Sequence, residues 1–239
     1  MPILEGEKVT KYFGGLAAVS NVDFHVDQGE IFGLIGPNGA GKTTLFNLVS
    51  ASLALKSGVI KFKGEKISGL KPYQICRKGV ARTFQSVKIF GNMPVRENVL
   101  LGALFGTPTT MAAPNAAMEA AELLDFVGLS EMSTTLASEL TLVNQKLLEV
   151  ATALATKPEL LLLDELMAGL TPTEIAEAME LVTKIRDRGI TIFMIEHVMK
   201  AIMGVCGRIM VLHHGEKIAE GKPQEIATSK KVIEVYLGE

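Results

Sequence analysis

The residues best suited to chemistry form a glycine-rich run that ends in a lysine and two threonines. Gly36 to Thr43, GPNGAGKT, satisfies the pattern G-x-x-x-x-G-K-[ST] at every fixed position. Glycines let successive main-chain N–H groups point at one anion, and the lysine adds a positive charge. We predict that the phosphates of a nucleotide are held here, with the Thr43 hydroxyl on Mg²⁺, by Gly36, Asn38, Gly39, Ala40, Gly41, Lys42, Thr43 and Thr44.

Two carboxylates and a histidine follow apolar runs further along the chain. The run LLLLDE ends in Asp164 and Glu165, and its four leucines are typical of a strand buried on both faces. At the tip of that strand Asp164 is suited to Mg²⁺, and Glu165 to polarising an attacking water as a general base. His197 follows the run ITIFMIE, so the same sheet edge would deliver its imidazole toward the phosphates. An isolated histidine is more often a surface residue, and we interpret the remaining ones as structural: His25, His213 and His214.

The elements that must position these residues alternate along the chain. Glu30–Ile35 is a short apolar run before the glycines, and Thr43–Ala51 continues at helical spacing. A strand at Leu160–Leu163, a helix at Thr173–Arg188 and a strand from Ile190 repeat the alternation. This order predicts an α/β fold with a P-loop NTPase core and a mainly parallel sheet.

Other segments predict additions to that core. Alternating apolar residues between Val19 and Val26, and the run GVIKFKGEKI, indicate a small antiparallel β portion. We predict one domain over residues 1–239, with a helical subdomain inserted at about 90–156. A hairpin turning at His214-Gly215 and a last helix are expected at about 207–239.

Composition narrows the class of protein. The 239 residues are 48% hydrophobic and 21% charged, which predicts an ordered globular chain. The net charge of −2 and the lack of like-charge blocks disfavour nucleic acid as a partner.

Cys76 and Cys206 stand alone, which indicates a reducing, cytosolic setting. No run of 18 apolar residues occurs, so we expect no membrane-spanning helix. The mean hydropathy is high. The favoured explanation is a well-filled core, and the alternative is an apolar face for a partner.

The order of phosphate loop, TFQ, helical region, LLLLDE and IEH resembles the nucleotide-binding subunit of an ABC transporter over essentially the whole chain. KYFGGLAAV, VARTFQ, LLLLDELMAGLTPTE, IEHVM and VIEVYLGE are similar to the branched-chain amino-acid importer class. The resemblance implies an ATPase with ATP and Mg²⁺ as cofactors, on the cytoplasmic face of the inner membrane. It would energise uptake of branched-chain amino acids or of a related solute, such as an amide, urea or an aromatic acid.

The resemblance also implies roles and partners. Phe13 would stack on adenine, with Tyr12 as the alternative, and Gln85 would touch Mg²⁺ and the lytic water. Two such subunits sandwich two ATP molecules in this family, and each site borrows a signature loop from the other subunit. The implied partners are a second ATPase subunit, transmembrane permease subunits and, indirectly, a substrate-binding protein.

The signature loop is altered in this chain. Residues 140–144 read LTLVN where the family has Leu-Ser-Gly-Gly-Gln, so Thr141 and Asn144 are expected to act on the partner's nucleotide. Thr141 remains a good N-cap, but the β-carbons of Leu142 and Val143 disfavour a positive φ. One lost charge-assisted hydrogen bond would weaken the closed sandwich by about 1.5 to 3 kcal/mol. We therefore predict pairing with a different ATPase subunit, with a homodimer as the alternative. Further departures from the family are Thr152, Leu166 and Thr171.

Two further expectations concern docking and competing functions. Residues 86–105 are apolar on more sides than a surface helix needs, which predicts that part of them meets a membrane subunit. A soluble ABC-type ATPase in translation, repair or cofactor assembly is the main alternative. A P-loop GTPase is disfavoured because the chain has no Asn-Lys-x-Asp guanine box. A small-molecule kinase is disfavoured because it would not call for an Asp-Glu pair followed by a histidine at the end of the next strand.

Overall fold

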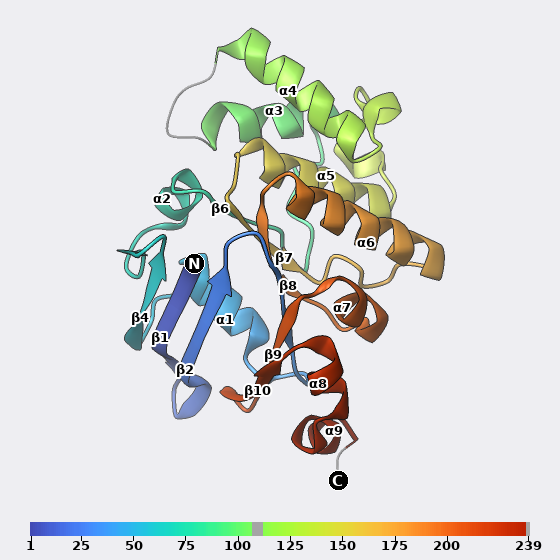
Figure 1. The fold of residues 1–239 in the computed structure, drawn as a ribbon. Helices are drawn as coiled ribbons and strands as arrows, with labels where there is room; N and C mark the ends of the chain where they lie inside the picture. The colour runs from blue at the N-terminus through green and yellow to red at the C-terminus, as the bar shows by residue number, and fades with distance from the viewer. Residues whose placement is uncertain (107–111, 238–239) are drawn as a thin grey trace.

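The computed structural model describes residues 1–106 and 112–237, and its strands form two sheets (Figure 1). The smaller sheet is antiparallel and has the strand order β2-β1-β4-β5. Its strands are β1 (Pro2–Phe13), β2 (Leu16–Asp27), β4 (Ser57–Phe62) and β5 (Glu65–Lys66). The predicted antiparallel β portion is therefore confirmed.

The larger sheet has the order β10-β9-β3-β8-β7-β6. All neighbours in it pair in parallel except β10, which runs antiparallel to β9 at the edge. Its strands are β3 (Ile31–Ile35), β6 (Val80–Arg82), β7 (Leu160–Asp164), β8 (Thr191–Ile195), β9 (Arg208–His213) and β10 (Glu216–Gly221). This arrangement confirms the mainly parallel sheet, and it brings the carboxyl ends of β3, β7 and β8 to one edge.

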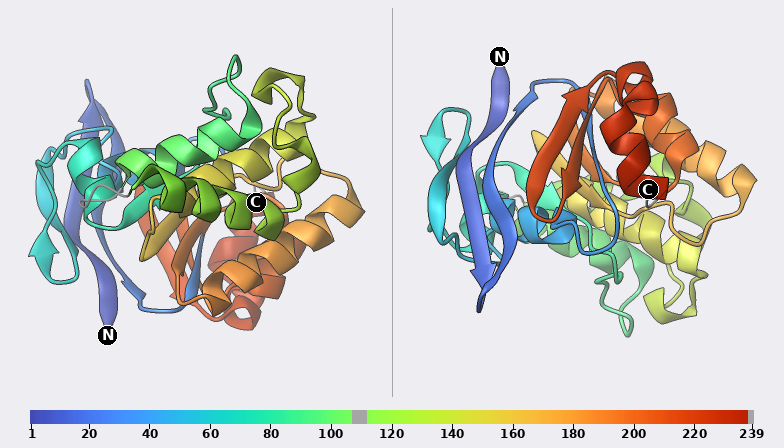
Figure 2. Two further views of the ribbon diagram at one scale, coloured as in Figure 1. Left: turned by 90° about the horizontal axis from the view of Figure 1, so that it is seen from above. Right: turned by 90° about the horizontal axis from the view of Figure 1, so that it is seen from below.

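The helices cover both faces of the larger sheet. They are α1 (Lys42–Val49), α2 (Pro72–Arg77), α3 (Val95–Phe105), α4 (Ala113–Phe126), α5 (Leu142–Ala155), α6 (Pro172–Asp187), α7 (Met199–Val205), α8 (Pro223–Thr228) and α9 (Lys230–Leu237). Two 3₁₀ turns, Ser130–Met132 and Ala137–Glu139, lie between α4 and α5. Figures 1 and 2 show α3 and α4 stacked on the outer side of α5.

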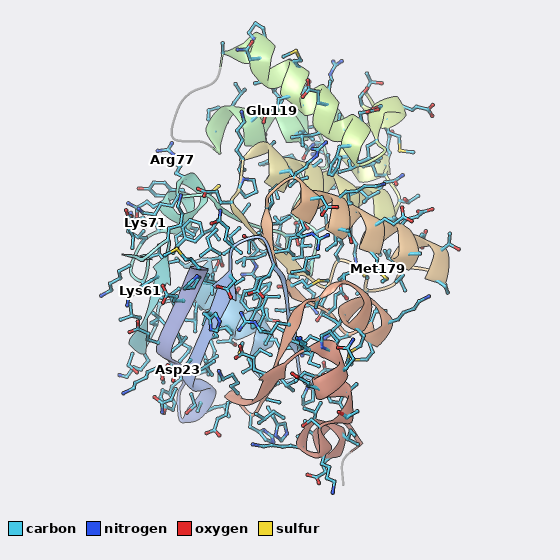
Figure 3. All side chains as sticks on the ribbon, viewed as in Figure 1. Asp23, Lys61, Lys71, Arg77, Glu119 and Met179 are labelled. Carbon is cyan, nitrogen blue, oxygen red and sulfur yellow. The ribbon has the colours of Figure 1, made fainter. Side chains whose placement is uncertain are left out.

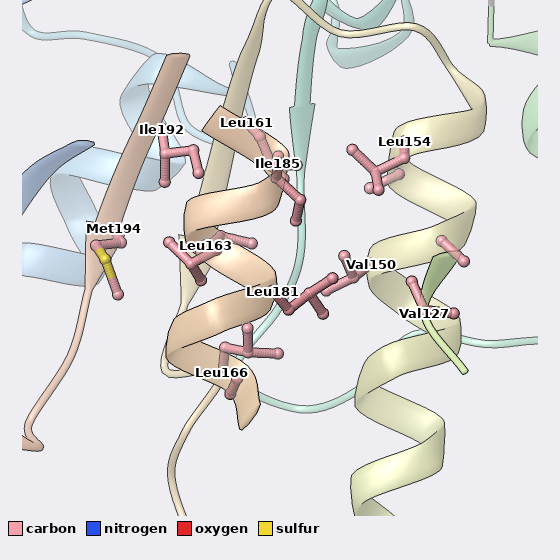
Figure 4. Close-up of a cluster of buried hydrophobic side chains, with 14 of the residues drawn as sticks. Val127, Val150, Leu154, Leu161, Leu163, Leu166, Leu181, Ile185, Ile192 and Met194 are labelled. Carbon is pink, nitrogen blue, oxygen red and sulfur yellow. The ribbon is translucent and has the colours of Figure 1, made fainter. Parts of the chain in front are cut away.

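The core has two parts because successive side chains of a strand point to opposite faces. On one face Leu161 and Leu163 of β7 pack, together with β8, against α5 and α6, as Figure 4 shows. On the other face Leu160 and Leu162 join the cluster formed by α1 and the antiparallel sheet. Both faces of β7 are therefore buried, as its run of leucines predicts.

Charged side chains occupy the outer faces of the molecule. Asp23 and Lys61 lie on the antiparallel sheet, Lys71 and Arg77 lie near α2, and Glu119 projects from α4, as Figure 3 shows. Ion pairs such as Lys61 with Glu7 are exposed, so they add little stability. Within residues 1–106 and 112–237, no helix has the length and apolar character needed to cross a bilayer.

Two features differ from the sequence predictions. The strand-like run ARTFQSVKIF predicts that Gln85 closes a strand, but β6 ends at Arg82 and Gln85 lies in the following loop. Two helices, α8 and α9, follow the C-terminal hairpin where one was expected. The residues of that expected closing helix at positions 238–239 lie outside the described range. The hairpin itself turns at His214-Gly215 as predicted.

Candidate nucleotide-binding and hydrolysis site

The glycine-rich loop joins the end of β3 to the start of α1. Gly41 caps the helix with a φ of 102°, a conformation that favours glycine. A β-carbon at this position would meet the carbonyl oxygen of Ala18 at 2.2 Å. Both the conformation and the close approach therefore require glycine, and they present the main-chain N–H groups of the helix start to the cavity beside it.

The lysine of this loop is folded back over the loop itself. Lys42 Nζ donates to the carbonyl oxygens of Gly36 at 2.7 Å and Pro37 at 3.1 Å, and the residue is 6% exposed. Burial lowers the pKa of Lys42, while the negative charges of Glu165 and Asp164 act in the opposite direction. The ammonium is therefore partly desolvated and tethered where an anion on the loop would meet it.

A cavity of about 390 Å³ opens beside the loop and gathers most of the predicted site. Predicted residues that line it are Phe13, Asn38, Gly39, Ala40, Gly41, Lys42, Thr43, Thr44, Gln85, Glu165 and His197. Gly36, Asp164, Thr141 and Asn144 are not among its lining residues. Segments more than 150 residues apart in the sequence thus meet around one volume, large enough to hold a small-molecule ligand.

The aromatic pair at the end of β1 divides between two environments. Phe13 lines the cavity with 48% of its surface exposed, and Lys11 Nζ lies 5.4 Å from its ring centroid. Tyr12 is 43% exposed but does not line the cavity. An exposed ring face beside a phosphate-binding loop is suited to stacking on a base, and this geometry favours Phe13 over Tyr12.

Glu165 is held between two polar side chains from other loops. Gln85 Nε2 donates to Glu165 Oε2 at 2.9 Å, and His197 Nε2 lies 2.7 Å from Glu165 Oε1. Glu165 has a φ of 54°, which is uncommon for a residue with a side chain and costs roughly 1 to 3 kcal/mol. The three residues predicted to be catalytic therefore meet at one carboxylate, on a strained backbone of the kind that clusters at active sites.

Asp164 lies deeper than its neighbour and has an unpredicted partner. Its Oδ2 accepts from Arg82 at 2.8 Å, and both side chains are almost fully buried. Burial raises the pKa of Asp164, and the bond to Arg82 partly offsets that shift. Arg82 also donates to Asn47 Oδ1 at 2.6 Å, which ties β6 to α1. Asp164 Oδ1 is buried without a hydrogen-bond partner among the described residues.

The structure places His214, which the sequence interpretation treats as structural, at the edge of the nucleotide cavity. This residue lines the same cavity, together with Leu16, Ala17 and Ala18. Gly215 N–H donates to the carbonyl of Ala40 at 3.0 Å, which holds the β9–β10 turn against the phosphate loop. No local motif signals this contact, because it arises from the parallel pairing of β3 with β9.

The altered signature segment begins α5. Thr141 is its N-cap, as predicted, and its hydroxyl accepts from Asn144 N–H at 3.4 Å. Leu142 and Val143 are the first residues of the helix, and neither has a positive φ. The expected conformational cost of replacing glycine at these two positions is therefore absent in this structure. Leu142 is 53% exposed, and the Asn144 amide donates to the sulfur of Met132.

A family model for ABC transporters matches residues 19–168, more than half of the chain. The chain belongs to the ATP-binding cassettes of ABC transporters. As a member of this family it binds nucleotide and hydrolyses ATP. A second family model, for the branched-chain amino acid ATP-binding cassette transporter, matches residues 216–239.

Individual ATP-binding cassettes match this chain over its full length. The chain is 40% identical to the high-affinity branched-chain amino acid transport ATP-binding protein BraF of Pseudomonas aeruginosa, and 41% identical to LivG of Escherichia coli. Both matches cover 100% of this chain and 98% of the relative. Among solved structures, a nucleotide-free cassette from an ABC transporter has a TM-score of 0.90 at 30% identity, and a cassette in its ADP conformation has 0.91 at 31%. Each of these matches covers 100% of both chains.

Proposed function

We propose that this cassette hydrolyses ATP to energise the import of branched-chain amino acids. The substrate class is supported by the relatives BraF and LivG and by the C-terminal match. The observation that carries the hydrolytic role is Glu165, held by Gln85 and His197 at the edge of a cavity lined by the phosphate loop.

In this proposal the nucleotide lies along the cavity from Phe13 to Glu165. The ring of Phe13 stacks on the adenine, and main-chain N–H groups from Gly39 to Thr44 cradle the phosphates. Lys42 exchanges its two bonds to loop carbonyls for phosphate oxygens. This exchange needs little movement, because the amine is already anchored over the loop.

Glu165 acts as the general base. Its carboxylate accepts a proton from a water that attacks the terminal phosphoryl group in line with the leaving oxygen. Gln85 and His197 each hold one oxygen of the carboxylate, so its orientation is fixed before the nucleotide enters. In the tautomer with hydrogen on Nε2, His197 donates to Glu165 and can turn that donor to the phosphate as charge develops.

The residues at the end of β7 and the start of α1 fit Mg²⁺, which would neutralise charge on the phosphates. The fit rests on Asp164 Oδ1, a buried oxygen with no hydrogen-bond partner in the described part of the chain. Thr43 at the start of α1 and Gln85 across the cavity supply further oxygens. Such a set suits a hard cation that keeps several waters and binds through one carboxylate.

We further propose that the N-terminus of α5 serves the nucleotide bound by a second ATPase subunit. Thr141 and Asn144 lie outside the cavity of their own chain, which suits a role across an interface. The free N–H groups of the helix start can receive a phosphate. Because the segment lacks the family's glycines and glutamine, a different ATPase subunit is the favoured partner, and the site that receives residues 140–144 is the weaker of the two.

The segment that follows Gln85 is proposed to dock on the permease subunits. Phe90 is 59% exposed and Phe105 is 68% exposed, whereas Val95 and Val99 are buried. Ile89 and Met93 are only partly buried, so residues 86–105 keep apolar surface outside the core. Docking there would place the cassette on the cytoplasmic face of the inner membrane, with a substrate-binding protein acting on the other side.

Reconstitution tests this function directly. The chain is purified together with the membrane polypeptides that accompany it, and uptake of leucine, isoleucine and valine into liposomes is measured with Mg-ATP on the cassette side. We expect uptake that Lys42→Met abolishes and that Lys184→Met, at an exposed lysine, leaves unchanged. Hydrolysis without any co-purifying membrane polypeptide would instead favour a soluble ABC-type ATPase.

A further inference from the structure

Two buried charges lie on one face of α5, away from the cavity. Lys146 is 7% exposed and Glu149 is 6% exposed, and neither lines the nucleotide cavity. Residues three apart in a helix are neighbours on its surface. Buried charges are costly unless they are fully hydrogen-bonded. The hydrogen-bond partners of Lys146 and Glu149 therefore indicate the role of each side chain.

Lys146 holds the loop that follows Glu165. Its Nζ donates to the carbonyl oxygens of Glu165 at 3.1 Å, Leu166 at 2.9 Å and Ala168 at 2.7 Å. A lysine has three N–H donors, and all three are used here on the main chain of one loop. The Glu165 N–H in turn donates to the carbonyl of Ile195 at 2.9 Å. The backbone of Glu165 is therefore fixed on both sides.

Glu149 holds the loop that carries Gln85. Its two carboxylate oxygens accept from the N–H groups of Phe84 at 3.3 Å and Lys88 at 2.8 Å, which lie on either side of Gln85 in the chain. Through Glu149 and Lys146, one helix thus contacts both loops that meet where Gln85 bonds to Glu165 at 2.9 Å.

Burial disfavours the charged form of both side chains, and it shifts the pKa of each accordingly. It lowers the pKa of Lys146, while the charges of Glu196, Glu165 and Glu149 act in the opposite direction. It raises the pKa of Glu149, against the two main-chain hydrogen bonds and the charge of Lys146. The two side chains therefore support each other's charge inside the protein, and removing either leaves the other with less compensation.

The strained conformation of Glu165 shows why such a hold is needed. A φ of 54° persists in a residue with a side chain only where the surroundings enforce it. The carbonyl of Glu165 accepts the Ala168 N–H at 3.3 Å and the Lys146 ammonium at 3.1 Å, so Lys146 supplies the charged one of its two donors. Loss of that contact would let the peptide relax and would move the carboxylate away from His197.

We propose that Lys146 and Glu149 are positioning residues that set Glu165 and Gln85 against each other, so that α5 controls the geometry of hydrolysis in its own chain. The proposal rests on the proposed ATPase role of Glu165. Because α5 begins at the segment offered to a second subunit, movement of its N-terminus reaches the general base through Lys146.

The test compares variants that remove or keep the hydrogen bonds. Lys146→Met keeps the length of the side chain and removes its donors, whereas Lys146→Arg keeps a buried cation. In the full chain assembled with its partner ATPase subunit, we expect kcat for ATP hydrolysis to fall about 10- to 100-fold in Lys146→Met, since misplacement by about 1 Å costs that much. The Kd for Mg-ATP should stay within twofold, and Lys146→Arg should recover most of the rate. Glu149→Leu and Glu149→Gln form the second pair, with the same order expected.

Folding is followed by circular dichroism, and rates are taken per folded molecule, so a merely structural role would leave kcat unchanged. Should Lys146→Met fail to fold, Lys146→Gln, which keeps donors for part of the loop, takes its place with a smaller expected loss. A crystal structure of the variant gives an activity-independent result: the 2.7 Å contact of Glu165 with His197 should be lost. An unchanged contact, or a kcat within twofold of wild type, overturns the proposal. A wild-type chain that hydrolyses no ATP even when assembled with its partner ATPase subunit would refute the proposed function, and the crystallographic comparison would still decide the role of Lys146.

Discussion

Around Glu165, side chains from two other loops converge on one carboxylate, whereas at the N-terminus of α5 the polar side chains bond to their own helix and to Met132. The first region has a strained backbone and the second an ordinary capped helix start. Strain is retained where geometry is needed for chemistry, and a helix start offers N–H groups without it. The comparison supports the proposals that one region is assembled for hydrolysis within this chain and that the other offers general features to a partner.

The largest effect should come from the carboxylate itself. Glu165→Gln removes the general base and keeps the size of the side chain, so kcat should fall about 10²- to 10⁴-fold. The Kd for Mg-ATP should change little, because Lys42 and the loop amides remain. Glu180→Gln, at an exposed glutamate of α6, is the matched control. Full turnover in Glu165→Gln would remove the basis for treating the two regions as different.

The buried pair behind the cavity should dominate stability. Arg82→Met leaves Asp164 buried without its cation, and such a break costs about 3 to 5 kcal/mol in free energy of unfolding. Urea denaturation measures this loss, with the exposed Arg96→Met as control. The second change Asp164→Asn should recover part of the stability, because it removes the uncompensated charge. A loss below about 1 kcal/mol would show that the pair is not buried in solution.

Glu196, next to His197, makes the free energy of unfolding depend on pH. It is 1% exposed, accepts from Met167 N–H at 2.7 Å, and burial raises its pKa to about 7. The folded state therefore holds this proton more tightly, so the stabilising contribution is full below about pH 4.5 and is lost as the pH rises through about 7. The total change should be about 3 kcal/mol at most. Glu196→Gln should flatten the pH profile of the unfolding free energy, and an unaltered profile would contradict this account.

The smallest effect is expected at the start of α5. Leu142 has a helical conformation and is 53% exposed, so Leu142→Gly restores no conformation that leucine prevents. ATP turnover of the assembled transporter should rise or stay within about threefold, while the helix loses up to about 1 kcal/mol. Thr141→Ala, which removes the N-cap, should cost a similar amount of stability. A tenfold fall in turnover for Leu142→Gly would mean that the leucine has been recruited into the partner's site.

The parts of the site that the sequence predicted are those encoded by contiguous residues. The phosphate loop between β3 and α1, and the carboxylates ending β7, each carry their own local pattern of apolar run, turn and polar residue. Parallel pairing of β3, β7 and β8 then brings their ends together, so the meeting of Glu165 with His197 could be expected from the fold class.

The parts that the sequence missed depend on contacts between distant segments. Arg82 pairs with Asp164 across adjacent strands, and His214 reaches the cavity from a turn at the other side of β3. Lys146 in a helix of apolar character gives no sign that it serves the main chain of another loop. The burial of a charged residue is visible only in three dimensions, which is why these residues escape pattern reading.

Calorimetry of Mg-ATP with the Glu165→Gln chain tests the central claim most directly, because it measures the phosphate site without turnover. The account predicts saturable binding to the folded chain, with a Kd at least tenfold weaker when Lys42→Met is added, since one charge-assisted bond contributes about 1.5 to 3 kcal/mol. Absence of binding to the folded Glu165→Gln chain, or an affinity indifferent to Lys42→Met, would contradict it.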